Sequence, residues 1–354
     1  MTVANPTIET ELVAYSAPES TSARLHQRAL RVMPGGNTRT TVHRDPYPPY
    51  AAKGYGQTIV DVEGQERIDF LNNYTSLIHG HAHPDVVAAV VDQVHRGSSF
   101  GLPTRHEVDL AELLVDRIAS VDQVRFTNSG TEAVMMALQA ARAYTGRPMI
   151  AKFEGAYHGA YDFAAVSTSI PAGQAGDAEP AATPHAVGTP DAVVDGVAVA
   201  RYNDIEGLER VVARHKDRLA AVLVDLMPWR MGLIAAEAAF VHALREMTRA
   251  HGILLIVDEV ITLRVAPGGA QALYGVTPDL TTMGKVIGGG FPVGAVGGRA
   301  EVMAVFDPRG GQPKVPHGGT FTANPVTMAA GLATMRKLTP DAYRRLDEHG
   351  AELR

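Results

Sequence analysis

Short apolar runs alternate with longer amphipathic segments from about residue 120 onward. The runs are typical of buried strands and lie at Val124–Thr127, Met149–Phe153, Ala220–Val224, Ile253–Val257 and Asp279–Met283. Between them, Thr131–Tyr144 and Ala238–Ala250 carry apolar residues at helical spacing. This alternation predicts an α/β fold in which a mostly parallel central sheet is covered by helices on both faces.

Polar residues directly follow four of the apolar runs. They are Asn128–Thr131, Glu154–His158, Asp225 and Asp258–Glu259. Ligands of open α/β sheets bind at the carboxyl ends of the strands. The pattern therefore predicts one site that is built from four strand ends.

The remaining parts of the chain are less regular. Residues 1–70 hold a polar arm and a stretch rich in Pro and Gly, which predicts an N-terminal arm and a portion of a small domain. Residues 71–338 are expected to form a large domain, and residues 339–354 to begin a C-terminal one. Ser167–Val197 is rich in Ala, Pro, Gly and Asp without a clear period, which predicts a long surface excursion.

Composition narrows the function classes. The net charge is −6, whereas nucleic acids and anionic membranes bind basic surfaces. The chain has no cysteine, which excludes disulfides, thiolate nucleophiles and thiolate metal ligands. The first twenty residues do not resemble a signal peptide, and no apolar run is long enough to span a bilayer. We therefore expect a soluble, cytoplasmic protein that binds neither nucleic acid nor membrane.

Ser129 and Glu132 have the spacing of a capping box at a helix N-terminus, and Gly146 is a plausible end of that helix. Capping is one explanation of Ser129. The other is that Ser129, Gly130 and Thr131 hold a phosphate, because a helix N-terminus offers free amides and the positive end of a dipole. The turn by itself is compatible with both.

Asp258 and Lys285 are the candidate catalytic residues. Asp258 ends an apolar strand, where it could cap a helix, bind Mg²⁺ or hold the positive charge of a ring nitrogen. Lys285 lies in "GKVIGGGFPVGAVGG", whose small apolar neighbours would lower the pKa of the amine. Such an amine suits Schiff-base chemistry. The alternative is a solvated lysine on a flexible loop.

Several aromatic and histidine residues could bind a planar ring or a metal ion. Tyr157 and His158 offer an aromatic face to a planar ring, or else are a core aromatic and a loop histidine. The motif "HGHAH" at residues 79–83 has no carboxylate tied to it, and "HEVDL" at His106 lacks the second histidine of a zincin helix. No metal site is expected.

Five motifs in combination carry a family resemblance. "TNSGTEA", "YHG", "VDEV", "GKVIGGGFPVGA" and "HGGTF" occur in this order. Together they resemble the class III pyridoxal-phosphate aminotransferases of fold type I. Within that family the chain is most similar to the glutamate-1-semialdehyde aminomutase branch, and there to bacterial β-phenylalanine (β-amino acid) aminotransferases. The likeness covers roughly Arg31–Leu338.

The resemblance implies roles for the candidate residues. Lys285 would form the Schiff base with pyridoxal 5′-phosphate and then shuttle a proton. Asp258 would keep the pyridine nitrogen protonated. Val260 and Tyr157 would clamp the two faces of the ring, with His158 also at the cofactor.

The same resemblance implies how the phosphate is held. Ser129, Gly130 and Thr131 would bind it within one subunit. Thr320 would add a hydroxyl to the phosphate of the neighbouring subunit, because the active sites of these enzymes are shared across a homodimer interface.

Substrate residues are indicated by one match and one departure. Arg39 in "MPGGNTRT" matches the arginine that pairs with a substrate carboxylate in the β-phenylalanine enzymes. Where relatives carry Glu-Pro and small residues, this chain reads "DLMPWRMG" from Asp225 onward, so Trp229 or Arg230 is expected to reshape the substrate pocket. Relatives also continue past residue 354 into a small C-terminal domain, which we expect to be missing here.

These observations predict an aminotransferase with a ping-pong mechanism. The donor would be a carboxylate-bearing β- or ω-amino acid resembling β-phenylalanine, and the acceptor a 2-oxo acid. One alternative is a 2,1-aminomutase of the glutamate-1-semialdehyde type. The other is a truncated, non-catalytic remnant of the fold.

Overall fold

The computed structural model describes residues 17–170 and 180–353. Most of the expected N-terminal arm and the middle of the Ser167–Val197 excursion therefore lie outside the described residues. The chain divides into two compact units. The first contains the chain up to Asn72 together with His79–His83, and the second contains Asn73–Ile78 and the chain from Pro84 onward.

The described part of the first unit combines a helix with a three-stranded antiparallel sheet in the order β1-β2-β3. Its elements are α2 (Thr21–Leu30), η1 (Pro34–Gly36), η2 (Thr40–Val42), β1 (Ala51–Tyr55), β2 (Thr58–Asp61) and β3 (Glu66–Ile68). In the "HGHAH" motif, His81 Nε2 lies 2.7 Å from Asp69 Oδ2. This histidine thus has a carboxylate partner nearby in the fold. The residues that the structure describes contain no His, Asp and Glu cluster suited to a metal ion.

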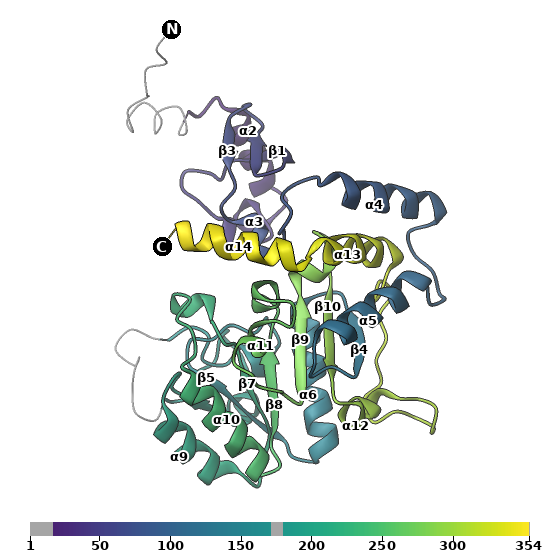
Figure 1. Ribbon diagram of the computed structural model, residues 1–354. Coiled ribbons are helices and arrows are strands. Elements are labelled where there is room, and N and C mark those ends of the chain that lie inside the picture. The colour runs from purple at the N-terminus through teal and green to yellow at the C-terminus, as the bar shows by residue number, and fades with distance from the viewer. Residues whose placement is uncertain (1–16, 171–179, 354) are drawn as a thin grey trace. The chain divides into compact units, whose positions relative to one another are not determined.

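The described part of the second unit is built on a seven-stranded sheet in the order β4-β10-β9-β8-β7-β5-β6 (Figure 1). Its strands are β4 (Gln123–Thr127), β5 (Met149–Phe153), β6 (Val197–Ala200), β7 (Leu219–Val224), β8 (Leu254–Asp258), β9 (Leu280–Gly284) and β10 (Gly294–Gly298). Only β10 among them runs against its neighbours, since it pairs antiparallel with both β4 and β9. The sheet is therefore mostly parallel, as predicted.

Helices connect these strands, and several are single turns. They are α3 (Asn72–Thr75), α4 (Pro84–Arg96), α5 (Arg105–Arg117), α6 (Gly130–Thr145), α7 (Asp162–Ala165), α8 (Asp191–Val194), α9 (Ile205–His215), η3 (Trp229–Met231), α10 (Ala238–Ala250), η4 (Thr262–Val265), α11 (Ala270–Leu273), η5 (Lys285–Gly288), α12 (Ala300–Met303), η6 (Ala304–Phe306), α13 (Pro325–Lys337) and α14 (Pro340–Glu352). No helix of the described residues is both long and apolar enough to cross a membrane.

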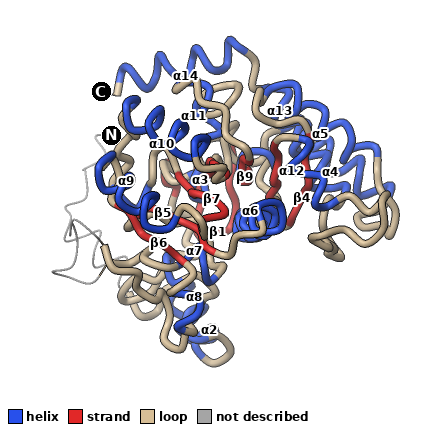
Figure 2. The backbone as a smooth tube through the Cα atoms, turned by 90° about the horizontal axis from the view of Figure 1, so that it is seen from below, coloured by secondary structure: helices blue, strands red, loops and turns tan. Residues whose placement is uncertain are grey.

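Helices lie on both faces of the sheet (Figure 2). Strands such as β5 and β7 are therefore buried at every position. On one face, Ile150 and Leu223 join the apolar cluster of α6 and α12. On the other face, Ala151 and Val222 join the cluster of α9 and α10. Burial on both sides explains why the strands are continuous apolar runs rather than alternating patterns.

The structure confirms the predicted strands and both predicted long helices. Two strands of the same sheet were not predicted. The strand β6 is only four residues long and begins where the expected excursion ends, and β10 reads "GAVGG", a composition with low strand propensity. Pairing with neighbouring strands on both sides forms β10 despite that composition.

Candidate active site

The turns that follow β4, β5, β8 and β9 meet at one edge of the sheet. His158, in the turn after β5, bonds to Asp258 at the end of β8. The amide of Ala160 donates to Thr131 Oγ1 in the turn after β4, at 3.2 Å. The expectation of a single site built from strand ends agrees with this geometry.

Asp258 is the best-connected side chain of the site. Its Oδ2 atom lies 2.7 Å from His158 Nδ1, and its Oδ1 accepts bonds from Val260 N and Thr282 Oγ1 at 3.1 and 3.0 Å. Burial acts to raise the pKa of Asp258, but the hydrogen bonds from His158, Val260 and Thr282 together outweigh it and the pKa is lowered. Asp258 is therefore a carboxylate at neutral pH.

His158 is buried beside this carboxylate. Burial lowers its pKa although Asp258 acts in the opposite direction, so the imidazole is neutral at pH 7 and donates its Nδ1 proton. Its Nε2 atom is buried and has no hydrogen-bond partner in the described part of the chain. His158 is thus a buried partner of Asp258, and its role toward a cofactor stays a prediction.

Lys285 is half-buried and has an unusual backbone. Its φ of 49° lies in the left-handed region, which costs a non-glycine residue roughly 1–2 kcal/mol. Burial lowers the pKa of the amine, while the charge of Asp258, and that of Asp225 once Asp225 is ionised, act to raise it. The lowered pKa agrees with the prediction, although two acids that are distant in sequence oppose the effect of burial.

Asp225 directly follows β7, and Asp258 is the last residue of the neighbouring strand β8. Val224 and Val257, which directly precede the two acids, are register partners in β7 and β8. Burial, followed by the charge of Asp258, raises the pKa of Asp225 to about 8. The carboxyl group of Asp225 is therefore mostly protonated at pH 7.

The turn before α6 has the features of a phosphate site. Ser129 Oγ accepts a bond from Glu132 N at 3.2 Å, whereas the Glu132 carboxylate binds the amide of Asn128, so the capping box is only partly formed. Within the described residues, no acceptor pairs with the amides of Gly130 and Thr131. These free amides sit at the positive end of a 16-residue helix.

Glycines around Lys285 permit close packing of protein against protein. An added Cβ on Gly294 would lie 2.0 Å from the carbonyl oxygen of Ser129, and one on Gly284 would lie 3.3 Å from Val260 Cγ1. The lysine loop therefore supports the phosphate turn directly. The glycines of this loop are thus explained in part by close contacts with Ser129 and Val260 of the same chain.

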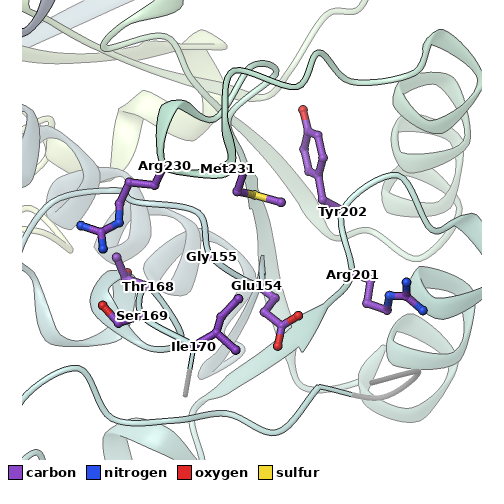
Figure 3. Close-up of a pocket in the computed structure, with 9 residues that line it drawn as sticks. All are labelled: Glu154, Gly155, Thr168, Ser169, Ile170, Arg201, Tyr202, Arg230 and Met231. Atoms are coloured by element: carbon purple, nitrogen blue, oxygen red, sulfur yellow. The ribbon is translucent and has the colours of Figure 1, made fainter. Parts of the chain in front are cut away.

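Tyr157, an expected cofactor residue, contacts one of the expected substrate residues. Its ring meets Trp229 edge-on at 6.1 Å, and the Arg230 guanidinium lies 5.7 Å from the Trp229 ring centre. Arg230 also lines a cavity of about 510 Å³ together with Glu154 and residues 168–170 (Figure 3). The "DLMPWRMG" departure is thus placed next to Tyr157.

Two further predicted residues are exposed. Arg39 is an exposed residue of the first unit, directly before η2. Thr320 is exposed and lines a second cavity of about 500 Å³ with Phe100 and Leu102. Their suggested contacts with a substrate carboxylate and with the partner's phosphate stay predictions.

Two polar residues of this region were not predicted. Thr282 bonds to Asp258 because the two are register partners of β9 and β8, a signal that requires the strand pairing to be known. Lys152 is fully buried in β5, where a lysine in an apolar run gave no sequence signal of a role.

Comparison with known proteins places this site in a family. The family model described as aminotransferase class-III matches residues 40–354. The chain belongs to the class-III aminotransferases. Three proteins similar to this class-III aminotransferase carry different activities in their names.

Two of the relatives are solved structures and one is a curated sequence. An omega-transaminase from Sphaerobacter thermophilus is 63% identical with a TM-score of 0.94, over 96% of this chain and 78% of that chain. A β-phenylalanine aminotransferase from Variovorax paradoxus is 38% identical with a TM-score of 0.85, over 96% and 74%. A glutamate-1-semialdehyde 2,1-aminomutase from Methanothermobacter thermautotrophicus is 42% identical over 94% of this chain and 77% of the relative.

Family membership confirms the predicted fold type, enzyme class and cofactor. This class-III aminotransferase is a pyridoxal-phosphate-dependent transaminase of fold type I. The residues present fit the cofactor, because the unpaired amides of Gly130 and Thr131 suit a phosphate and the ionised Asp258 suits a protonated ring nitrogen. The individual role of each residue remains a proposal.

Proposed function

We propose that the enzyme moves an amino group from a carboxylate-bearing β- or ω-amino acid to a 2-oxo acid in a ping-pong reaction. The placement of Lys285 carries the chemical part of this proposal, since a half-buried amine of lowered pKa lies among the acids that follow β7 and β8. The likeness to an omega-transaminase and to a β-phenylalanine aminotransferase supports the substrate class.

When bound, pyridoxal 5′-phosphate supplies an aldehyde that accepts the amino group and an electron-withdrawing ring that acidifies the neighbouring C–H bond. Lys285 holds the cofactor and afterwards moves a proton, which its lowered pKa favours at neutral pH. Asp258 keeps a proton on the ring nitrogen, and His158 holds Asp258 in position. Val260 and Tyr157 would pack against the two faces of the ring.

Ser129, Gly130 and Thr131 hold the phosphate through amides and hydroxyls at the start of α6. On the substrate side, Trp229 and Arg230 form a wall next to Tyr157. The guanidinium of Arg39 or Arg230 would bind the substrate carboxylate, because arginine can do so with two parallel hydrogen bonds.

We also propose that the enzyme is a homodimer with shared active sites. Val87, Val91 and Val94 lie three and four residues apart on α4, on a single helix face, and are 45%, 49% and 52% exposed. Phe100 and Leu102, which line the cavity of Thr320, are exposed as well. A second copy would cover this apolar surface.

A 2,1-aminomutase is the second candidate, since curated relatives of 41–45% identity carry that name. The two reactions differ in their need for an external acceptor. With β-phenylalanine alone we expect one half-reaction per site, and with an added 2-oxo acid continued turnover. Continued turnover of glutamate-1-semialdehyde alone, with no reaction of β-phenylalanine, would show the mutase instead.

The same assay tests the proposed substrate wall. Trp229→Ala or Arg230→Ala should change kcat/KM for β-phenylalanine by about tenfold or more relative to a smaller β-amino acid. An unchanged substrate profile in both variants would remove these residues from the pocket.

A further inference from the structure

Lys152 is a lysine in the middle of the sheet. It belongs to β5, all five residues of which are buried, and its own exposed fraction is 0%. Placing an ammonium there is costly, and an apolar residue would fill the same volume without that cost. Packing alone therefore does not explain the residue.

The ammonium group binds two separate stretches of backbone. Lys152 Nζ donates to the carbonyl oxygens of Ala156 and Val166 at 2.9 and 2.5 Å, and lies 3.4 Å from Thr168 Oγ1. Three donors thus meet three neutral acceptors. Burial lowers the pKa of Lys152 to about 7, and the neutral amine retains two donors.

Further bonds join the same two stretches. Thr168 Oγ1 donates to the carbonyl oxygen of Ala156 at 3.3 Å. The amide of Gly155 donates to the carbonyl oxygen of Ser167 at 2.8 Å. Figure 3 shows the result, in which Gly155 and Thr168 line one cavity. The carbonyl oxygen of Ala156 therefore accepts bonds from both Lys152 and Thr168.

The anchored residue directly precedes Tyr157 and His158. Tyr157 faces Trp229, and His158 bonds to Asp258. A shift of Ala156 would move both side chains together, and a displacement of about 1 Å at such a site is enough to cost a large factor in rate.

We infer that Lys152 is a positioning residue of the active site: by tying Ala156 to Val166 and Thr168, it fixes Tyr157 and His158 where the cofactor ring requires them. This inference rests on the proposed roles of those two residues. It does not depend on which amino acid is the substrate.

The test compares Lys152→Met with two other variants. Thr168→Val removes one acceptor of the ammonium and the bond that Thr168 Oγ1 donates to Ala156, but leaves both bonds from Lys152 to the backbone. Leu114→Ala opens a cavity in α5, which packs on β4 and α13, and is the control for general destabilisation.

The first readout is hydrogen exchange of the cofactor-free protein, resolved to peptides. In Lys152→Met we expect exchange at residues 154–169 to rise about tenfold or more, while β7 stays within about twofold of the wild type. Thr168→Val should give a smaller rise in the same segment. Faster exchange spread evenly over the sheet, as in any destabilised variant, would overturn the inference.

The second readout is the dissociation constant of pyridoxal phosphate, titrated without any amino acid. It should rise about tenfold or more in Lys152→Met and stay within about twofold in Leu114→Ala. Equal affinities in wild type and Lys152→Met would also overturn the inference. A wild-type protein that binds cofactor but transfers no amino group would contradict the proposed function and leave this test intact.

Discussion

Asp225 and Asp258 follow register partners on neighbouring strands, yet they differ in protonation. Asp258 has three hydrogen-bond donors and a lowered pKa. Asp225 accepts a bond from Met227 N, and burial and the charge of Asp258 raise its pKa to about 8. The site thus holds one carboxylate and one neutral carboxyl group at pH 7. Lys285 lies close enough for the ionisation of either acid to change its pKa.

Asp225 gives the cofactor-free enzyme a distinctive pH dependence. Its folded pKa lies above the unfolded value near 4, so its contribution to stability is complete below about pH 4 and is lost as the pH rises toward 8. In that window the slope from this group is up to about 1.4 kcal/mol per pH unit. Asp225→Asn should flatten the decline, measured as the free energy of unfolding in urea.

The exposed Asp92 of α4 provides a matched control, because Asp92→Asn makes the same chemical change on the surface. Its pH dependence should follow the wild type. An Asp225→Asn curve that also follows the wild type would mean that Asp225 is ionised throughout the window.

Among the elements, β10 links the lysine loop to the phosphate turn. It lies between β4 and β9, and Gly294 at its start touches the carbonyl oxygen of Ser129. A side chain at this position has no room on either side, since Thr127 Oγ1 is close as well. The strand therefore couples the positions of Lys285 and the phosphate site.

Gly294→Ala tests this coupling. The added methyl group would displace the turn at Ser129, which we expect to cost about 1–3 kcal/mol of stability and to weaken pyridoxal phosphate binding. Gly310→Ala is the control, because nothing lies within 4 Å of its added Cβ. Chemical denaturation and a cofactor titration measure both effects, and wild-type cofactor affinity in Gly294→Ala would show that the turn is not coupled to β10.

The sequence predicted those elements that are determined by residues close to one another along the chain. Apolar runs such as Met149–Phe153 identified strands, and polar residues after them identified the site, because ligands bind where parallel strands end. The sequence did not predict β10, because its glycine-rich segment forms a strand only through pairing with β4 and β9. It also did not predict the bond between Thr282 and Asp258, which follows from the register of β9 and β8. The role of Lys152 depends on contacts with residues up to sixteen positions away.

For the whole molecule, the proposed dimer makes the apolar face of α4 an interface. Val91→Glu would place a charge in its centre, and we expect the dimer dissociation constant to rise about 100-fold or more because a buried, unpaired charge is costly. Sedimentation equilibrium measures the change. Leu273→Glu on α11 alters an exposed apolar residue outside this face and should leave the dimer intact. A wild-type enzyme that is monomeric and active would refute the shared site.

The most direct test of the proposed function is the visible absorption spectrum of the enzyme with pyridoxal phosphate, recorded beside Lys285→Ala and a surface control, Lys216→Ala. We expect an absorption band that depends on Lys285, declines when β-phenylalanine is added without a 2-oxo acid, and returns when a 2-oxo acid follows. A wild-type band that β-phenylalanine leaves unchanged, or an identical band in Lys285→Ala, would contradict the proposal.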